Sequence, residues 1–319
     1  MAGLVAGVDV GGTFTDLMIL DPATGDVRLS KVPTTLPNQA GGVLAAFEAA
    51  GADLADVDLI VHGTTTTTNA VLERALCKTG LITTEGFRDV LELGRRTRPN
   101  AYGMTGRFVP VIPRDLRLEV PERMDAKGRV LTPLDEPALR AAVQHLADQG
   151  CESLVIHFLH AYANPAHEKA LGRLLRKAFP KHFITLSHEI LREYREYERT
   201  STTVLNAYVG LEVSQYLKAL EEPLRQQSFQ GKFMIMQSNG GVMSAKRAAH
   251  IPVGMMESGP AGGIIGAGML GQLLNEPDVI AFDMGGTTAK TCLVEKGMPK
   301  MTDQYFIGGY QHGHPMRLP

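Results

Sequence analysis

The sequence is poor in cysteine. Its 319 residues contain three, Cys77, Cys151 and Cys292, which lie far apart and form no CxxC spacing. This argues against a disulfide framework and against a structural zinc site built on cysteines. It is typical of a reducing compartment, so we expect a cytoplasmic protein.

An excess of charge of one sign and long apolar runs are also missing. The 32 basic and 34 acidic residues give a net charge of -2, without the basic balance or patch typical of nucleic-acid binders. No stretch approaches eighteen uninterrupted apolar residues, so we expect no membrane-spanning helix. The apolar N-terminus has no basic region and soon reaches Asp9, which argues against a signal peptide.

Apolar material is plentiful, at 44% of the residues, and the length suggests about two domains. Apolar runs at 4–10, 14–20, 58–64 and 151–160 predict strands, and amphipathic helical segments alternate with them. This alternation indicates an α/β fold. The segment 95–137 is rich in Arg, Pro and Gly, and its strand-like pieces RLEV and GRVLT predict an inserted hairpin. We place a domain boundary near 190–205.

One pattern occurs twice. AGVDVGGTFTDLMILD at 6–21 and IAFDMGGTTAKTCLVEK at 280–296 each join an apolar strand, an Asp, one residue, Gly-Gly-Thr and a second apolar strand. A single copy is weak, because an Asp near glycines is also ordinary β-hairpin chemistry. Two copies with matching flanks indicate duplicated structural units.

These residue types suit a polyphosphate. Gly-Gly permits a turn with positive φ and, without β-carbons, lets a phosphate approach the backbone N–H groups closely. Thr13 and Thr287 add hydroxyls at the rim of each turn. Asp9 and Asp283 would hold a hydrated divalent cation or orient a water, and Mg²⁺ typically binds through one or two carboxylates. Two such hairpins facing a cleft would grip a nucleoside triphosphate from both sides.

The paired hairpins resemble the phosphate loops of the actin, sugar-kinase and heat-shock ATPase superfamily. Within it, the chain resembles the hydantoinase A, 5-oxoprolinase and acetone carboxylase β-subunit family. The motifs that carry this resemblance are GVDVGGTFTD, HGTTTTTNAVLER, TTEGFRDVLELGR, REYERTSTTVLNAYV, SNGGVM, ESGPAGG and FDMGGTTAK.

The resemblance implies ribonuclease-H-like ATPase lobes. Residues 1–195 would form the N-terminal lobe with phosphate loop 1 and the insertion 95–137. Residues 196–319 would begin the second lobe with phosphate loop 2. In the family the chain continues to a further glycine-rich loop, so we expect this sequence to match the N-terminal part of the family's length. The second lobe would then be incomplete, and the sequence would be either a fragment or a natural split subunit.

The same resemblance assigns site residues. Asp9 and Asp283 would be the catalytic carboxylates. The nucleotide-binding residues would be Gly11, Gly12, Thr13, Thr15, Asp16, Gly259, Gly262, Gly285, Gly286, Thr287, Thr288 and Lys290. The segment 259–263 would open a helix near the nucleotide, where free N–H groups attract anions. Close helix–sheet packing is an equally good account of Gly262 and Gly263.

Three further residues are candidates for substrate contacts. His62 and Thr64 precede a hydroxyl-rich helix start, where the threonines serve either as helix caps or as part of the cleft lining. Arg95 lies in the Arg-rich segment, where an arginine clamp on a carboxylate competes with an ordinary surface loop.

Histidines cluster at 157–167. His160 and His167 are candidate ligands for Zn²⁺ or Mn²⁺, because these ions favour imidazole. The alternative is that they are ordinary structural histidines.

The resemblance points to an ATP-dependent amidohydrolase that opens a hydantoin or 5-oxoproline ring, with Mg²⁺ or Mn²⁺ and a B-type partner subunit in a hetero-oligomer. Phosphorylation of the amide oxygen would turn a poor electrophile into one that water can attack. Three alternatives stay open: an ATP-dependent ketone carboxylase subunit, a small-molecule kinase of the superfamily, and a non-catalytic, nucleotide-gated assembly subunit. Neither a nucleic acid nor a membrane is expected as a partner.

Overall fold

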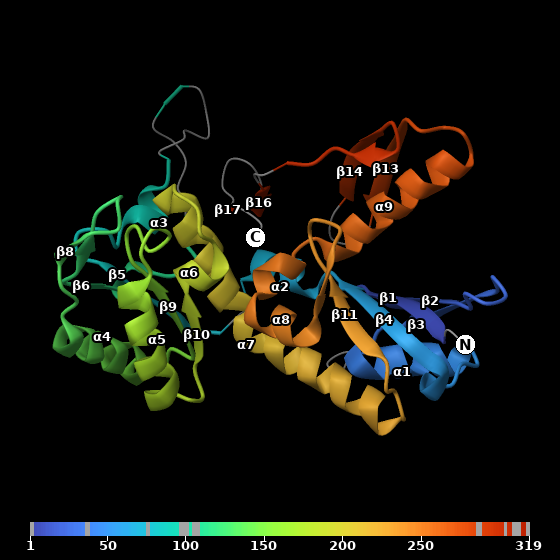
Figure 1. The fold of residues 1–319 in the computed structure, drawn as a ribbon, viewed down its shortest axis with the longest axis horizontal. Helices are drawn as coiled ribbons and strands as arrows, with labels where there is room; N and C mark the ends of the chain where they lie inside the picture. The colour runs from blue at the N-terminus through green and yellow to red at the C-terminus, as the bar shows by residue number, and fades with distance from the viewer. Residues whose placement is uncertain are drawn as a thin grey trace. The chain divides into compact units, whose positions relative to one another are not determined.

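A computed structural model of the chain describes residues 3–35, 39–74, 77–95, 102–103, 109–284, 289–302, 305–307 and 314–316. It has the mixed α/β architecture expected from the sequence (Figure 1). The chain divides into two compact units, each built from two stretches of sequence. Unit 1 comprises residues 1–69 and 213–302, and unit 2 comprises residues 70–212 and 303–319.

These units differ from the two predicted lobes. The boundary expected near 190–205 lies around the start of α7 (Glu196–Gln226), a 31-residue helix that passes from unit 2 into unit 1. The predicted lobes 1–195 and 196–319 were defined by the two copies of the hairpin, whereas the two units are defined by which residues pack together. The lobes therefore stay a prediction.

A six-stranded mixed sheet forms the centre of unit 1, in the order β12-β11-β4-β1-β2-β3. β1, β2 and β3 form an antiparallel meander, β4 runs parallel to β1, and β11 runs parallel to β4. The strands are β1 Leu4–Val10, β2 Phe14–Leu20, β3 Val27–Pro33, β4 Val57–Thr64, β11 Lys232–Met236 and β12 Val242–Ser244.

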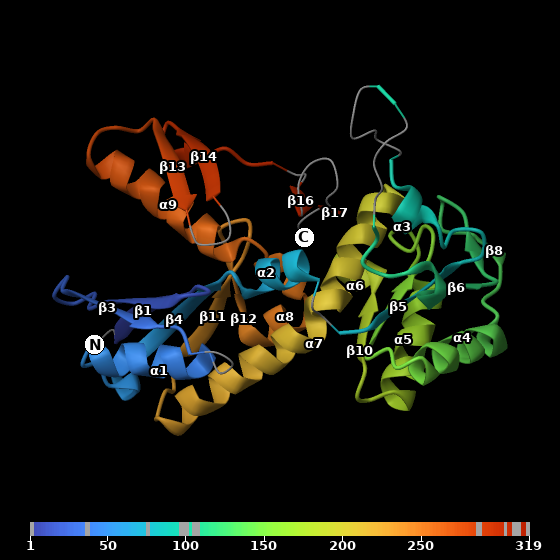
Figure 2. The ribbon, with the colours of Figure 1, turned by 180° about the vertical axis from the view of Figure 1, so that it is seen from behind.

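The two faces of this sheet differ because side chains alternate along a strand. Ala6, Val8 and Val10 of β1 are buried on one face, which α1 (Gln39–Ala49) covers. Figures 1 and 2 show α1 and the end of α7 on this side. Gly7 and Asp9 therefore point to the opposite face. α9 (Ser258–Leu273) lies against this sheet, where it contacts β4 and β11.

α9 leads into a second, three-stranded antiparallel sheet of β13 (Val279–Met284), β14 (Ala289–Glu295) and β15 (Met298–Pro299). The helix packs against all three strands. The remaining elements of unit 1 are the 3-10 helices Leu54–Asp56 and Pro252–Met255, helix α8 (Ala245–His250) and the first turn of α2 (Thr66–Glu73).

Unit 2 contains a four-stranded parallel sheet in the order β10-β9-β5-β6. Helices α4 and α5 contribute buried leucines to its core, together with Leu154, Val155 and Ile156 of β9. Its elements are β5 Thr79–Thr84, α3 Val90–Leu93, a 3-10 helix Arg114–Leu116, β6 Arg117–Val120, β7 Arg123–Met124, β8 Val130–Thr132, α4 Glu136–Asp148, β9 Ser153–His157, α5 Ala166–Ala178, β10 Phe183–Leu186, α6 Ser187–Ile190, most of α7, β16 Tyr305–Ile307 and β17 His314–Met316.

The insertion 95–137 contains the expected hairpin and both expected strands, but one of these strands does not pair within the hairpin. Val130–Thr132 from GRVLT pairs with Arg123–Met124 as the antiparallel hairpin β7–β8. RLEV is β6, and it joins the parallel sheet beside β5. Arg117 at its start is fully buried and contacts the Glu92 carboxylate, so this strand belongs to the core of unit 2.

Candidate functional site: a carboxylate-lined cleft in unit 1

The first predicted phosphate loop joins β1 to β2. The Gly11 N–H donates to the Phe14 carbonyl at 3.0 Å, and the Thr34 hydroxyl donates to the Gly11 carbonyl at 2.9 Å. Contrary to the prediction, neither Gly11 nor Gly12 has a positive φ. Glycine matters at position 12 for another reason: a β-carbon there would meet no atom within 4 Å, so the backbone at the tip is open to a ligand.

Two other predicted residues of this loop have partners within unit 1. Thr15 is fully buried, and its hydroxyl lies 3.2 Å from that of Thr34, so it supports the loop from inside rather than lining its rim. Asp16 pairs with Lys31 across β2 and β3, with 2.7 Å between the charged atoms. Thr13 is exposed at the turn.

Asp9 occupies a narrow gap between two glycines. A β-carbon on Gly259 would lie 3.0 Å from Asp9 Oδ1, and one on Gly63 would lie 3.4 Å from the same oxygen. Any larger residue at position 259 would press on the carboxylate. Partial removal from water raises the pKa of Asp9 above its ordinary value, and the nearby carboxylates of Asp16 and Asp283 raise it further.

The second predicted loop joins β13 to β14. Asp283 lies at the end of β13, whereas Gly285, Gly286, Thr287 and Thr288 are outside the described residues. Lys290 on β14 forms an ion pair with Glu257, the residue that precedes α9. Burial lowers the pKa of Lys290, and its positive charge is placed at the start of that helix.

Both aspartates line one cleft of about 750 Å³ in unit 1. The sheet face beside Asp9 and Asp16 forms one wall, and Ser258, Gly259, Gly262 and Gly263 of α9 form another. Because a β-carbon on Gly263 would meet no atom within 4 Å, close helix–sheet packing does not require that glycine. The structure thus brings together Asp9, Asp16, Gly259, Gly262 and Asp283, five of the residues that the sequence predicts.

The start of α9 is fixed to the end of β4. The Ser258 hydroxyl donates to the Thr64 carbonyl at 3.1 Å and accepts from the Thr64 N–H at 3.3 Å. The Glu257 N–H donates to the Thr68 hydroxyl at 3.2 Å. Two members of the threonine run therefore anchor this helix start next to Asp9.

His62 and Thr64 themselves are buried on the sheet face opposite Asp9. His62 Nε2 lies 2.7 Å from the Tyr216 hydroxyl, and burial lowers the pKa of His62 to about 4, so its imidazole is neutral at pH 7. Arg95 is in unit 2, where its guanidinium forms two hydrogen bonds to the Glu198 carboxylate at 2.5 and 2.8 Å. The structure does not bring these three side chains to the cleft.

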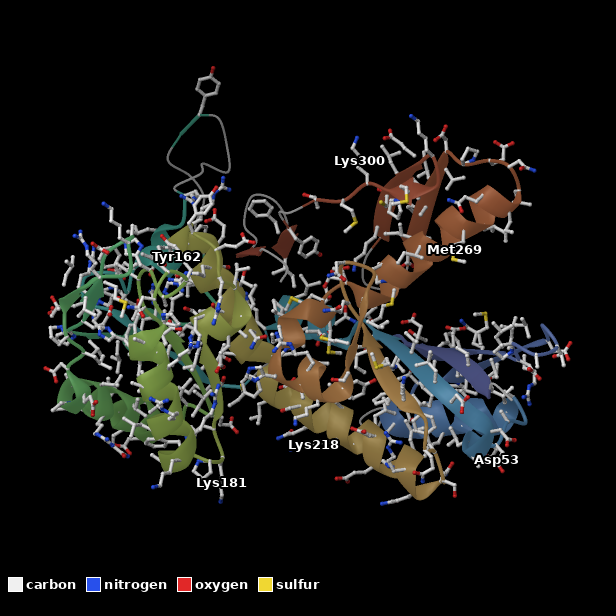
Figure 3. All side chains as sticks on the ribbon, in the orientation of Figure 1. Asp53, Tyr162, Lys181, Lys218, Met269 and Lys300 are labelled. Carbon is white, nitrogen blue, oxygen red and sulfur yellow. The ribbon has the colours of Figure 1, made fainter. Side chains whose placement is uncertain are left out.

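The histidine cluster lies in unit 2, and its members have separate partners. His160 Nδ1 lies 3.1 Å from the hydroxyl of Tyr162, which Figure 3 labels, and His167 Nδ1 lies 2.8 Å from Glu122. Among the residues that the structure describes, no three His, Cys, Asp or Glu side chains are grouped so as to hold a metal ion. The geometry therefore gives no support to a site at His160 and His167.

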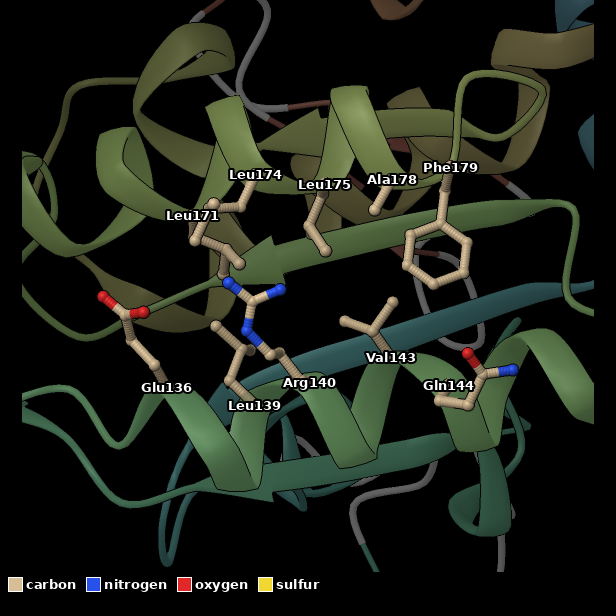
Figure 4. A pocket seen from close by; sticks show the side chains of 10 residues that line it. All are labelled: Glu136, Leu139, Arg140, Val143, Gln144, Leu171, Leu174, Leu175, Ala178 and Phe179. Carbon is tan, nitrogen blue, oxygen red and sulfur yellow. The ribbon is translucent and has the colours of Figure 1, made fainter.

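A second cavity, of about 200 Å³, lies between α4 and α5 (Figure 4). Leucines, Val143, Ala178 and Phe179 line most of it, with Glu136, Arg140 and Gln144 along one side. It contains none of the predicted site residues, and most of its lining is apolar.

Sequence reasoning assigned no role to Ser258, Glu257 and Tyr216. Ser258 and Glu257 stand in the quoted motif ESGPAGG, so the signal was present, but only the glycines were interpreted. Tyr216 is 154 residues from its partner His62, and no local pattern marks the pair.

Comparison with known families identifies the group of proteins to which the chain is similar. The model of the hydantoinase/oxoprolinase N-terminal region matches residues 5–179, and the hydantoinase/oxoprolinase model matches residues 199–319. The chain belongs to the hydantoinase/oxoprolinase family. The resemblance inferred from the motifs is thereby confirmed.

Individual relatives match almost the whole chain. An uncharacterised protein of Methanocaldococcus jannaschii is 41% identical over 99% of this chain and 48% of its own length. Caprolactamase subunit alpha of Pseudomonas jessenii is 32% identical over 97% of this chain and 46% of its own length. The chain spans about half the length of these curated relatives.

Solved structures share the fold. A nucleotide-free structure of acetone carboxylase, from work on ATP-dependent acetone carboxylation, has a TM-score of 0.86 at 29% identity, over 99% of this chain and 47% of that one. The ATP-dependent caprolactamase of Pseudomonas jessenii has a TM-score of 0.80 at 31% identity, over 98% and 47%. In this member of the family, no helix among the described residues has the length and apolar character needed to cross a membrane.

Proposed function

We propose that this protein acts in an ATP-dependent, hydantoinase-type enzyme that activates a cyclic amide by phosphorylation. The observation that carries the proposal is the cleft that Asp9, Asp283 and the start of α9 line together. A triphosphate in this cleft would meet the first N–H groups of α9, which attract anions, and Gly12 would offer open backbone at the tip of the neighbouring loop. The strand order β3-β2-β1-β4-β11 supports the ribonuclease-H-like ATPase lobe expected from the resemblance.

The cleft suits a divalent cation that arrives with the nucleotide. Burial raises the pKa of Asp9 most, and the nearby carboxylates of Asp16 and Asp283 raise it further, so a cation would relieve the repulsion among them. Two carboxylates with room for water and phosphate oxygens match what Mg²⁺ prefers. Mg²⁺ would neutralise the phosphate charge, with Asp9 and Asp283 as the residues that hold it.

The residues of the chain would contribute position and charge rather than a nucleophile, as is common in phosphoryl transfer. The amide oxygen would attack the γ-phosphorus and ADP would leave. Water would then attack the activated carbon, and the ring C–N bond would break as the nitrogen gains a proton, which leaves an acyl phosphate. A second water would hydrolyse the acyl phosphate to the carboxylate and phosphate. We propose that a B-type subunit completes the hydrolytic part of the site.

A ketone carboxylase subunit is the second candidate, because the acetone carboxylase structure shares this fold over nearly the whole chain. Both reactions require the same hold on the triphosphate, so the cleft alone favours neither. A kinase of the superfamily would instead release a stable phosphorylated product. An assembly subunit would bind nucleotide without turnover.

The test is to purify the protein with the subunits that co-purify with it and to supply MgATP. Hydantoin, 5-oxoproline and caprolactam are offered in parallel with acetone plus labelled bicarbonate. Ring-opened product formed in step with ADP supports the hydrolase, whereas label in a carboxylic acid product supports the carboxylase. If MgATP does not bind to the wild-type protein or its complex, the proposal is wrong.

A further inference from the structure

A buried hydrogen-bond network lies beneath the cleft, and the proposed function does not use it. We define the Thr64 network as His62, Tyr216, Thr64 and Ser258. Its members come from β4, α7 and α9; His62, Thr64 and Ser258 are buried in unit 1, and Tyr216 is partly buried. His62 and Thr64 lie on the sheet face opposite Asp9, so their side chains do not contact a ligand in the cleft, whereas Ser258 lies on the cleft wall.

Tyr216 joins the two β4 residues of this network. Its hydroxyl lies 2.7 Å from His62 Nε2, and it also hydrogen-bonds the Thr64 side chain. The Thr64 hydroxyl lies 3.4 Å from the Val10 carbonyl, to which it can only donate. His62 Nδ1 is buried and has no partner among the described residues.

Thr64 is the point at which this network meets the cleft. Its backbone bonds Ser258 twice, which ties the end of β4 to the start of α9. The residues next to this pair, Gly63 and Gly259, form the gap that contains the Asp9 carboxylate, and a β-carbon on Gly63 would lie 3.6 Å from Gly259 Cα. A shift of Thr64 would therefore change the width of the gap.

We infer that Tyr216 is a positioning residue of the cleft: through Thr64 and Ser258 it fixes the gap between Gly63 and Gly259 and hence the orientation of Asp9. The inference rests on the proposed function for its consequence, nucleotide binding. Its structural content, the hydrogen bond between His62 and Tyr216 and the surroundings of Asp9, is independent of that function.

The main variants are Tyr216→Phe, which removes one hydroxyl, and Thr64→Val, which replaces the hydroxyl by a methyl of similar shape. Thr64→Ser keeps the hydroxyl and serves as the conservative rescue. Tyr208→Phe removes a hydroxyl from a buried tyrosine of the same helix in its unit 2 part, and it is the matched control. Circular dichroism and thermal unfolding establish that each variant folds.

Two spectroscopic readouts decide the inference without nucleotide. Nitrogen NMR of the imidazoles, assigned with a His62→Gln variant, should show a neutral His62 at pH 7 whose Nε2 signal moves in Tyr216→Phe. Carbon NMR of labelled aspartates should show that Tyr216→Phe and Thr64→Val both move the pKa of Asp9 down toward its ordinary value. Thr64→Ser and Tyr208→Phe should keep the wild-type titration.

Calorimetry with MgATP tests the functional consequence. The two disruptive variants should bind roughly tenfold more weakly, the effect of about one lost hydrogen bond. If Asp9 titrates alike in wild type, Tyr216→Phe and Thr64→Val, the network is merely structural, even if the variants are less stable, and the inference is overturned. If the wild type binds no MgATP but Asp9 shifts as expected, the proposed function fails and the positioning role stands.

Discussion

Asp9 in unit 1 and Glu168 in unit 2 are carboxylates in opposite electrostatic surroundings. Glu168 is fully buried and accepts four hydrogen bonds, from the Phe158 and His188 N–H groups, the Ser187 hydroxyl and His188 Nδ1, at 2.6 to 2.9 Å. Asp9 instead faces Asp16 and Asp283. The folded chain satisfies Glu168 by itself, whereas Asp9 would gain from a cation.

This contrast explains why the denser polar cluster is not the better candidate site. In unit 2 the carboxylates already have partners: Glu196 contacts the fully buried Arg199, and Glu122 pairs with His167. A network whose members satisfy one another favours one packed arrangement. The cleft in unit 1 contains the Asp16–Lys31 ion pair, but Asp9 has two carboxylates beside it around open space. This arrangement is unfavourable for stability alone and useful for binding.

The substitution Asp9→Asn is the strongest test of this contrast between the carboxylates of Asp9 and Glu168. We expect MgATP binding or turnover to fall by at least about 100-fold, because a charge aimed at the phosphates and their cation is lost. At neutral pH the ligand-free protein should become more stable, since a like-charge repulsion disappears. Calorimetry and thermal unfolding measure the two effects, and Glu295→Gln, at an exposed position on β14, is the control. Unchanged binding would contradict the assignment of Asp9.

Glu168→Gln should have the opposite effects: it should lower the stability of the protein and leave MgATP binding unchanged. The amide places an N–H₂ group among four donors, so we expect the free energy of unfolding to fall by about 3 kcal/mol. Urea unfolding measures this change, with Glu136→Gln at an exposed position of α4 as the control. A loss of stability no larger than that of the control would mean that the network in unit 2 contributes little.

Acid should destabilise the protein through its buried histidines. The pKa of His62 is lowered to about 4 by burial, and that of His157 is also lowered well below its ordinary value, first by burial and then by Arg199. Between pH 6.5 and 4 the unfolded state therefore binds more protons than the folded state, and stability falls as the pH falls.

For His62 alone this loss amounts to roughly 3 kcal/mol at pH 4. Asp9 acts with the opposite sign, because its raised pKa makes the folded state the better proton binder. Urea unfolding at a series of pH values should show a shallower acid loss for His62→Gln and a steeper one for Asp9→Asn. Parallel curves for wild type and His62→Gln would show that this imidazole is not buried and neutral.

The smallest expected effect concerns the gap beside Asp9. Gly259→Ala would place a β-carbon 3.0 Å from the Asp9 carboxylate, so we expect roughly tenfold weaker MgATP binding with little change in stability. Gly266→Ala on the same helix meets open space and should raise the free energy of unfolding by about 0.5–1 kcal/mol. Equal binding by both variants would show that the gap does not set the position of Asp9.

The local elements were predictable because their signals are local. β1 and β2 have the bounds that their apolar runs predict, since Gly11 and Gly12 end one run and begin the next. The repeat also predicted that Asp9 and Asp283 would share a cleft, and they do.

Contacts between distant segments were not predictable from a single sequence. The sequence RLEV is equally compatible with a strand of a hairpin and with a strand of a parallel sheet. Only its pairing with β5 in the structure distinguishes the two. Lys290 is placed near the cleft, but its ion pair with Glu257 depends on how β14 packs beside α9. The bond between His62 and Tyr216 arises from the way a long helix crosses the sheet.

The segment that joins α9 to β13 determines where the Asp283 carboxylate lies. α9 begins beside Asp9, the chain turns at Asn275 with a φ of 59°, and β13 runs back to place Asp283 one residue before its end. Each residue of a strand advances the backbone by about 3.3 Å and reverses the side to which its side chain points. Deleting one residue from this distant turn would therefore slide Asp283 along the strand and aim it out of the cleft, while every atom around Asp9 stayed where it is.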